Sequence, residues 1–88
     1  MDQAKKIELA QFELFENNNA VLAERLLLEI AEQGNGHACH ELGVLYSMDQ
    51  NALKANKEKS VYWLNKSVEL GFEKTIATDT SWFKGNAN

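Results

Sequence analysis

The chain has 88 residues, which suits one domain because most domains contain about 100–200 residues. Hydrophobic residues make up 44% of the chain and charged residues 25%, a composition that favours a folded protein over disorder. Thirteen acidic side chains against nine basic ones give a net charge of −4, whereas non-specific nucleic-acid binding needs a basic surface. These values exclude a two-domain enzyme and predict a single domain over residues 1–88 that binds no nucleic acid.

Cysteine content and hydropathy indicate the cellular compartment. Cys39 is the one cysteine, so no disulfide can form within the chain, and the opening Met1-Asp2-Gln3 lacks the basic and apolar regions of a secretory signal. The most apolar stretch, 20–31, contains three charged residues and falls short of the roughly 18 apolar residues that a membrane span requires. We therefore expect a cytoplasmic protein that does not enter a membrane.

No proline occurs and helix-favouring residues are abundant, so we expect helices throughout. Apolar residues recur at helical spacing in five segments, which predict helices over 4–16, 20–33, 37–48, 57–70 and 73–84. Asn19 and Asn56 directly precede two of these segments, where asparagine can cap the free amides of a helix start. Gly34 and Gly71 follow the same two segments and suit the left-handed conformation that ends a helix. The predicted fold class is all-α.

Each predicted helix carries apolar positions that should face a core. The first helix has a stripe of three residues extended by two phenylalanines: Ile7, Ala10 and Leu14, with Phe12 and Phe15. The second helix is apolar on more than one face, which a helix between two neighbours can bury. The expected core positions of the third and fourth helices are Ala38, Leu42, Leu45 and Tyr46, and Ser60, Trp63, Leu64, Ser67 and Val68.

The chain also repeats within itself. A shift of 37 residues places Asn19 on Asn56 and Gly34 on Gly71, so the cap and stop positions both match, and Leu27 falls on Leu64. A period of this length that contains two helices is typical of an α/α solenoid, in which each helix pair buries its apolar face against the next. We therefore predict about two and a half helix-pair repeats with a C-terminal capping helix.

Two runs of residues resemble a known family: Ala38-x-x-x-Leu42-Gly43-x-x-Tyr46 and Asn56-x-x-Lys59-Ser60-x-x-Trp63-x-x-Lys66-Ser67-Val68-x-x-Gly71. This pattern is similar to the SEL-one-like repeat, a relative of the tetratricopeptide repeat. The resemblance implies a solenoid in which small residues such as Gly43 let helices cross closely. It also implies a protein-interaction module rather than an enzyme.

The chain departs from the family pattern at several positions. The loop at 47–55 has no glycine, although the family usually places glycines between its two helices. Three positions that are usually alanine are occupied by Ser60, Ser67 and Val68. Near the end of the chain, Asp79, Thr80 and Phe83 stand where one unit earlier the chain has Leu42, Gly43 and Tyr46, which is why we expect a polar capping helix there.

His37, Cys39 and His40 form the one cluster of metal-ligand side chains in the sequence. His37 and His40 are three residues apart, so a helix start could present both to one ion, and a thiolate is a soft ligand for zinc. A fourth ligand is missing, and adjacent residues on a helix point about 100° apart, which disfavours a Cys-His catalytic pair. We expect no cofactor and no enzyme activity. The alternative is a small metal-binding or enzymatic protein that uses these three residues.

The first helix of each pair lines the concave surface of such a solenoid, where we expect the partner to bind. On the third helix the core positions leave a neighbouring stripe of His37, Glu41, Val44 and Met48. The same register adds Glu8, Gln11 and Phe15 before it and Lys74, Thr78 and Ser81 after it. Alternatively, Val44 and Met48 complete the core. We expect an adaptor, regulator or inhibitor that binds one other protein. The sequence does not decide between a concave and a convex binding face, and it allows a homodimer.

Overall fold

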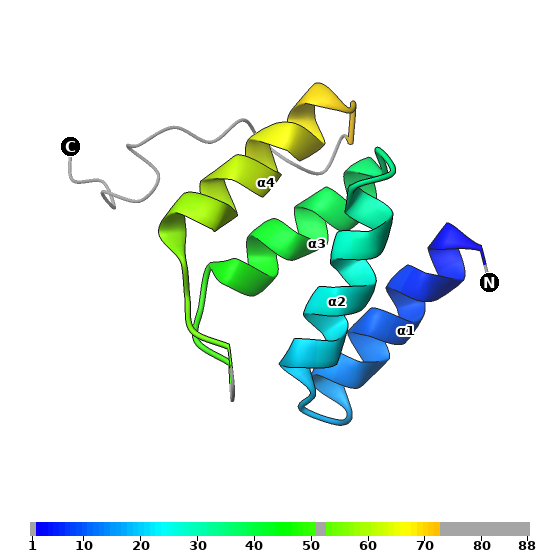
Figure 1. Ribbon diagram of the computed structural model, residues 1–88, viewed down its shortest axis with the longest axis vertical. Helices are drawn as coiled ribbons and strands as arrows, with labels where there is room; N and C mark the ends of the chain where they lie inside the picture. Colours follow the sequence, from blue (N-terminus) through cyan, green and yellow to red (C-terminus); the bar gives the residue numbers. More distant parts are fainter. Residues whose placement is uncertain (1, 51–52, 73–88) are drawn as a thin grey trace.

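The computed structural model describes residues 2–50 and 53–72, which form four α-helices and no β-strand (Figure 1). The helices are α1 (Gln3–Phe15), α2 (Ala20–Ala31), α3 (Gly36–Tyr46) and α4 (Lys57–Glu69). The predicted all-α fold is confirmed over these residues. The helix predicted for 73–84 lies outside the described residues. Within the described part of the chain, no helix combines the length and hydropathy needed to cross a bilayer.

An asparagine or aspartate side chain caps the start of each described helix. The Oδ1 atoms of Asn19 and Asn56 accept hydrogen bonds from the backbone N–H three residues later, at 3.2 and 3.0 Å, as predicted. Asp2 and Asn35 cap α1 and α3 in the same way, at 2.8 and 2.9 Å. Because each cap satisfies an amide that has no partner within its helix, these residues determine where the helices begin.

Glycines follow the ends of α2 and α4. Gly34 and Gly71 have φ angles of +90° and +84°, the left-handed conformation that glycine adopts without steric cost. After α4, the N–H groups of Gly71 and Phe72 donate to the carbonyls of Val68 and Ser67 at 2.9 and 3.1 Å. These two bonds form a Schellman motif, which satisfies the last carbonyls of the helix and turns the chain away from it.

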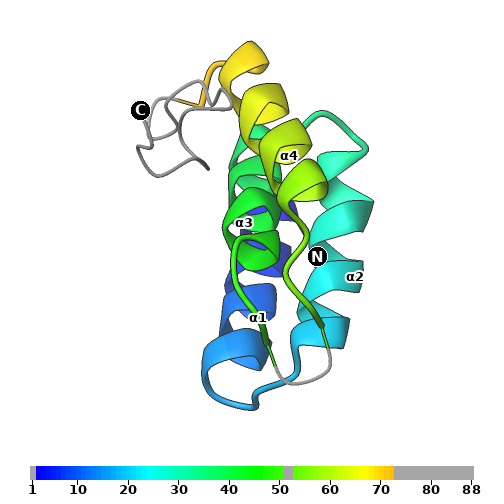
Figure 2. The same ribbon diagram turned by 90° about the vertical axis from the view of Figure 1, so that its left-hand side faces the viewer.

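The helices pack in sequence order, α1 on α2, α2 on α3 and α3 on α4. Figure 2 shows α1 and α3 toward one side of the molecule and α2 toward the other. Since α2 lies between α1 and α3, its apolar residues are buried on more than one face, as expected. The buried apolar residues are Ile7, Ala10, Ala20, Ala23, Leu27, Ile30, Ala31, Ala38, Cys39, Leu42, Leu45, Tyr46 and Leu64, and Ser60 and Ser67 are buried with them.

Five predicted core positions are not fully buried in the structure: Phe12, Leu14, Phe15, Trp63 and Val68, of which Leu14 and Val68 are partly buried. Phe12 and Phe15 are 53% and 71% exposed, because α1 packs on α2 and only the face with Ile7 and Ala10 is covered. Trp63 is half-buried at the edge of the core rather than enclosed by it. The prediction that these three aromatic side chains fill the core is therefore wrong for the phenylalanines and only partly right for Trp63.

Helices α3 and α4 approach each other closely at Gly43. A Cβ atom added to Gly43 would lie 2.4 Å from Cγ of Leu64 and 2.5 Å from its Cδ2, so any side chain at this position would force Leu64 to shift. Beside this contact, the buried hydroxyl of Ser60 donates to the backbone carbonyl of Gly43 at 2.7 Å. The expectation that Gly43 and small α4 residues let the helices cross closely is confirmed.

A second contact holds α3 against α2. The buried Tyr46 donates its hydroxyl to Oε2 of Glu24 at 2.6 Å, and Nζ of Lys59 lies 5.3 Å from the centre of the Tyr46 ring. Burial, and then the hydrogen bond to the Glu24 carboxylate, raise the pKa of the Tyr46 hydroxyl well above its usual range. The raised pKa keeps the Tyr46 hydroxyl protonated at neutral pH, so it can donate to the Glu24 carboxylate.

We expect Gly43→Ala to destabilise the protein. Helix propensity favours alanine by about 1 kcal/mol, but overpacking against Leu64 costs about 1–3 kcal/mol, so the net change is a loss of stability. Urea unfolding followed by circular dichroism measures it. In the Leu64→Ala background the clash with the side chain is absent and only the backbone N of residue 64, at 3.3 Å, stays close, so the same substitution should cost less there. Equal effects in both backgrounds would contradict the close contact.

Stability should fall at alkaline pH because of Tyr46. A tyrosine whose pKa is raised in the folded state stabilises the fold below the pKa of the unfolded chain, about 10, and this contribution is lost as the pH rises above that value. Tyr46→Phe should cost about 1–2 kcal/mol at neutral pH and flatten the decline above about pH 10. Thermal melts at each pH measure both effects. Tyr62→Phe, at an exposed position, is the control and should leave the decline unchanged.

Candidate functional site

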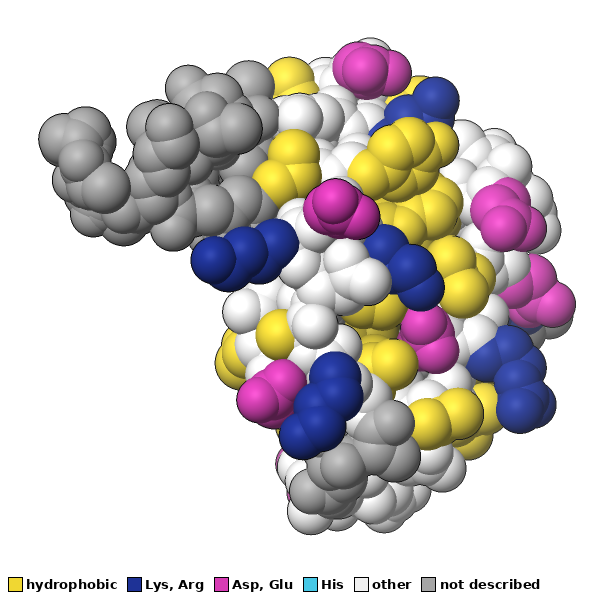
Figure 3. Space-filling view, turned by 60° about the vertical axis from the view of Figure 1, so that its left-hand side comes forward, with side chains coloured by type: hydrophobic (Ala, Val, Ile, Leu, Met, Phe, Trp, Pro, Cys, Tyr) yellow, Lys and Arg dark blue, Asp and Glu magenta, His cyan; other side chains and the backbone are white. Residues whose placement is uncertain are grey.

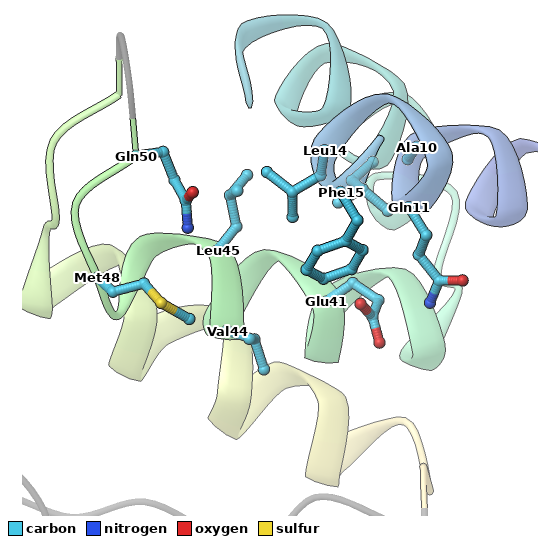
Figure 4. A pocket seen from close by; sticks show the side chains of 10 residues that line it. Ala10, Gln11, Leu14, Phe15, Glu41, Val44, Leu45, Met48 and Gln50 are labelled. Atoms are coloured by element: carbon cyan, nitrogen blue, oxygen red, sulfur yellow. The ribbon is translucent and has the colours of Figure 1, made fainter. Parts of the chain in front are cut away.

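A hollow of about 160 Å³ lies between α1 and α3 (Figure 4). Its floor is apolar, because Ala10, Leu27 and Leu45 are all buried side chains of the core. The complete set of lining residues is Ala10, Gln11, Leu14, Phe15, Leu27, Glu41, Val44, Leu45, Met48 and Gln50. The hollow thus opens from the surface directly onto the hydrophobic core.

The rim of the hollow carries three exposed apolar side chains. Phe15 is 71% exposed, Met48 50% and Val44 36%, and Figure 4 shows that they come from α1 and from the α3 side of the opening. Val44 and Met48 therefore do not complete the core, which was the alternative that the sequence left open. Large apolar side chains that gather around a cavity are a common feature of binding sites, whereas single ones scattered over a surface are not informative.

Polar side chains complete the rim. Gln11, Glu41 and Gln50 are each partly buried and supply amide and carboxylate groups beside the apolar opening. The Glu41 carboxylate lies 3.4 Å from Nε2 of His37, one turn earlier on α3. No lysine or arginine is among the described residues that line the hollow. Its rim therefore offers hydrogen-bonding groups and one negative charge.

The structure brings five of the ten predicted site residues together around this hollow: Gln11, Phe15, Glu41, Val44 and Met48. Glu8 is exposed on α1 but does not line the hollow, and His37 lies near the start of α3 with its ring stacked on Phe72 at 4.8 Å. The other three, Lys74, Thr78 and Ser81, lie outside the described residues. The predicted register of the first and third helices thus selects residues that meet in space.

Two rim or wall residues were missed by the sequence analysis. Leu14 was assigned to the core, because periodicity identifies an apolar face but not where that face stops being covered. Gln50 lies beyond α3 in the loop, where the Gln50 N–H donates to the Leu53 carbonyl at 2.7 Å. Helical spacing carries no information about a loop residue, so no signal in the sequence could have placed Gln50 at the hollow.

His37, Cys39 and His40 point to different surroundings. Cys39 is fully buried, its Sγ lies 4.0 Å from the Ala31 carbonyl, and burial raises the pKa of the thiol. The rings of His37 and His40 instead lie against Phe72, with centroids 4.8 and 5.1 Å away. In the described part of the chain, no group of three or more His, Cys, Asp or Glu side chains is arranged to hold a metal ion.

A wider and more open groove lies between α2 and α4. Figure 3 shows apolar side chains gathered there, with charged side chains on both sides. The residues that line it include Ala31 and Glu32 from the end of α2 and Tyr62, Trp63 and Lys66 from α4. The Tyr62 and Trp63 rings meet edge to face at 4.9 Å. If the partner binds the convex face, the alternative that the sequence left open, this groove is where we would expect it to bind.

Comparisons of the chain with protein-family models, curated proteins and solved structures found no match. Function is therefore inferred from the geometry of the two surfaces. The hollow between α1 and α3 is the more enclosed of the two, and apolar atoms form most of its wall. Because enclosure and apolar walls favour binding of a side chain, we take this hollow as the candidate site.

The buried thiol gives a direct test of how α3 is oriented. Cys39 should react with Ellman's reagent about 100-fold more slowly in the native protein than in urea, because the thiol is enclosed and its raised pKa leaves little thiolate. Absorbance of the released thiolate measures the rate. Rapid reaction in the native protein would place Cys39 at the surface, beside His37 and His40.

Proposed function

We propose that this chain is a non-enzymatic protein-interaction module, an adaptor, regulator or inhibitor that binds one protein partner at the hollow between α1 and α3. The observation that carries the proposal is the convergence of Phe15, Val44 and Met48, all exposed, on the rim of an enclosed apolar hollow. Exposed apolar side chains of this size favour association with another surface, since burying them removes apolar area from water.

The proposal includes the SEL-one-like repeat architecture, which two correspondences support. The caps Asn19 and Asn56 are 37 positions apart, and so are Gly34 and Gly71, the glycines with positive φ that follow α2 and α4. In the same register the fully buried Ala23 corresponds to the fully buried Ser60. Two helices that begin, pack and end at matching positions are what a repeat unit requires.

The first helices of the two units correspond in the same manner. The caps Asp2 and Asn35 are 33 positions apart, and this offset also relates Phe15 to Met48. Equivalent positions of successive units would then meet at one rim, as in solenoids that bind partners along their first helices.

The hollow is well suited to binding because its walls are already held in place. Leu64 packs on Gly43 and fixes α3 against α4, while the hydrogen bond from Tyr46 to Glu24 fixes α3 against α2. A partner would therefore meet a surface that needs little ordering, which lowers the entropic cost of association.

The proposed function is tested by capture with matched variants. Immobilised wild-type chain, Val44→Glu and Val21→Glu are each incubated with native lysate, and the captured proteins are compared by mass spectrometry. Val44→Glu places a charge on the rim, whereas Val21 is an apolar residue of similar exposure on α2, away from the hollow. A protein captured by wild type and Val21→Glu should be lost, by about tenfold or more, with Val44→Glu.

Circular dichroism and thermal melts must first show that both variants fold as the wild type does. The proposal is wrong if the captured protein binds Val44→Glu normally and is instead lost when Tyr62→Glu alters the groove between α2 and α4. In that case the α2–α4 face is the interface.

A further inference from the structure

The size and lining of the hollow between α1 and α3 limit what can occupy it. A cavity of about 150 Å³ with aliphatic and aromatic walls is large enough for one benzene molecule. The hollow measures about 160 Å³ and opens onto the apolar side chains of Leu14, Leu27 and Leu45. It therefore has room for one phenyl ring but not for a longer row of side chains.

Two rim residues favour an aromatic occupant over an aliphatic one. The exposed Phe15 can meet a second ring edge to face or offset, an arrangement that stabilises aromatic pairs beyond their buried area. The thioether of Met48 makes favourable contacts with aromatic rings and adapts its shape through three rotatable bonds.

The charge at the rim is negative. Among the described residues that line the hollow, Glu41 is the one with a charged side chain, which is 21% exposed. A carboxylate at the edge of an apolar cavity is less screened by water than one on an open surface, so it attracts a nearby cation more strongly. The net charge of −4 on the whole chain acts in the same direction at longer range.

Two lysines of the neighbouring helices have partners other than Glu41. Nζ of Lys6 on α1 lies 2.6 Å from Oε1 of Glu29 on α2. Lys59 of α4 lies over the Tyr46 ring, away from the hollow. On α3 itself, Nε2 of His37 lies 3.4 Å from Oε2 of Glu41 and forms an ion pair with it only when the imidazole is protonated. A cation from a partner would therefore share the Glu41 carboxylate with His37.

We propose that the hollow recognises a phenylalanine side chain of a partner segment that carries arginine or lysine next to it, with the phenyl ring in the hollow and the cation paired to Glu41. This inference rests on the proposed function and specifies the chemistry of the partner. The ring supplies most of the affinity through apolar burial, and the ion pair supplies preference among apolar segments, because a partly exposed ion pair contributes less than a buried ring.

The test is an NMR titration of the ¹⁵N-labelled chain with three short probes. They are N-acetyl-Phe-Arg amide, N-acetyl-Phe-citrulline amide, in which a neutral isostere replaces arginine, and N-acetyl-Ala-Arg amide. We expect shifts at Phe15, Val44 and Met48 with the first probe. The citrulline probe should bind about 2–5-fold more weakly, and the alanine probe at least about tenfold more weakly.

Two variants assign the preference to its residues. Glu41→Gln should remove the difference between the arginine and citrulline probes. Val21→Glu, on α2, should leave all three affinities unchanged. Added salt should reduce the preference in the wild type, since a partly exposed ion pair is screened.

Three outcomes would overturn the inference. Equal binding of the arginine and citrulline probes would remove the role of Glu41, and equal binding of the phenylalanine and alanine probes would remove the ring. Concentration-dependent dimerisation that Val44→Glu abolishes would make a second copy of this chain the occupant. None of these outcomes affects the capture experiment. If Val44→Glu loses a captured protein there, the proposed function is still supported even when this inference fails.

Discussion

The contact between Gly43 and Leu64 determines the position of α3, and the rest of the structure depends on it. With no side chain at residue 43, the Leu64 side chain fits against the α3 backbone, and the Ser60 hydroxyl satisfies the Gly43 carbonyl at 2.7 Å. A buried carbonyl bonded in this way costs nothing for its burial, whereas a larger residue would force the helices apart. Glycine weakens an isolated helix, so its place here is explained by packing between helices.

Because α3 is fixed from one side, its other side is free to form a surface. Leu42 and Leu45 face the core, while Glu41, Val44 and Met48 face the opening toward α1. One helix thus supplies both the interior of the protein and the rim of the candidate site. Neighbouring residues on α3 therefore differ sharply in what a substitution should do: Leu45 affects folding, and Val44 affects the surface.

The candidate site combines an apolar cavity with a single carboxylate, and these two features have different consequences. Burial of an apolar side chain is non-directional and accepts many ligands, so it gives affinity without much selectivity. The Glu41 carboxylate adds a preference for positive charge. Such a surface would bind a partner through its apolar side chains and would favour partners that carry a positive charge.

The helix boundaries and much of the core could be predicted from the sequence because they depend on local chemistry. Asn19, Asn56, Gly34 and Gly71 act on amides and carbonyls within a few residues, and helical spacing alone groups Leu42 with Tyr46. The grouping of Gln11 and Phe15 with Val44 could also be predicted, because matching positions of the first and third helices were expected to face the same surface.

Only the tertiary structure decided which apolar faces are covered and whether the grouped residues enclose a space. Phe12 and Phe15 have the spacing of core residues, yet they are exposed because α1 has too few neighbours to cover them. Gln50 reaches the hollow through the path of a loop, which helical periodicity does not describe. The hollow itself depends on the distance between α1 and α3, and contacts between residues distant in the sequence, Gly43 with Leu64 and Tyr46 with Glu24, determine where α3 lies.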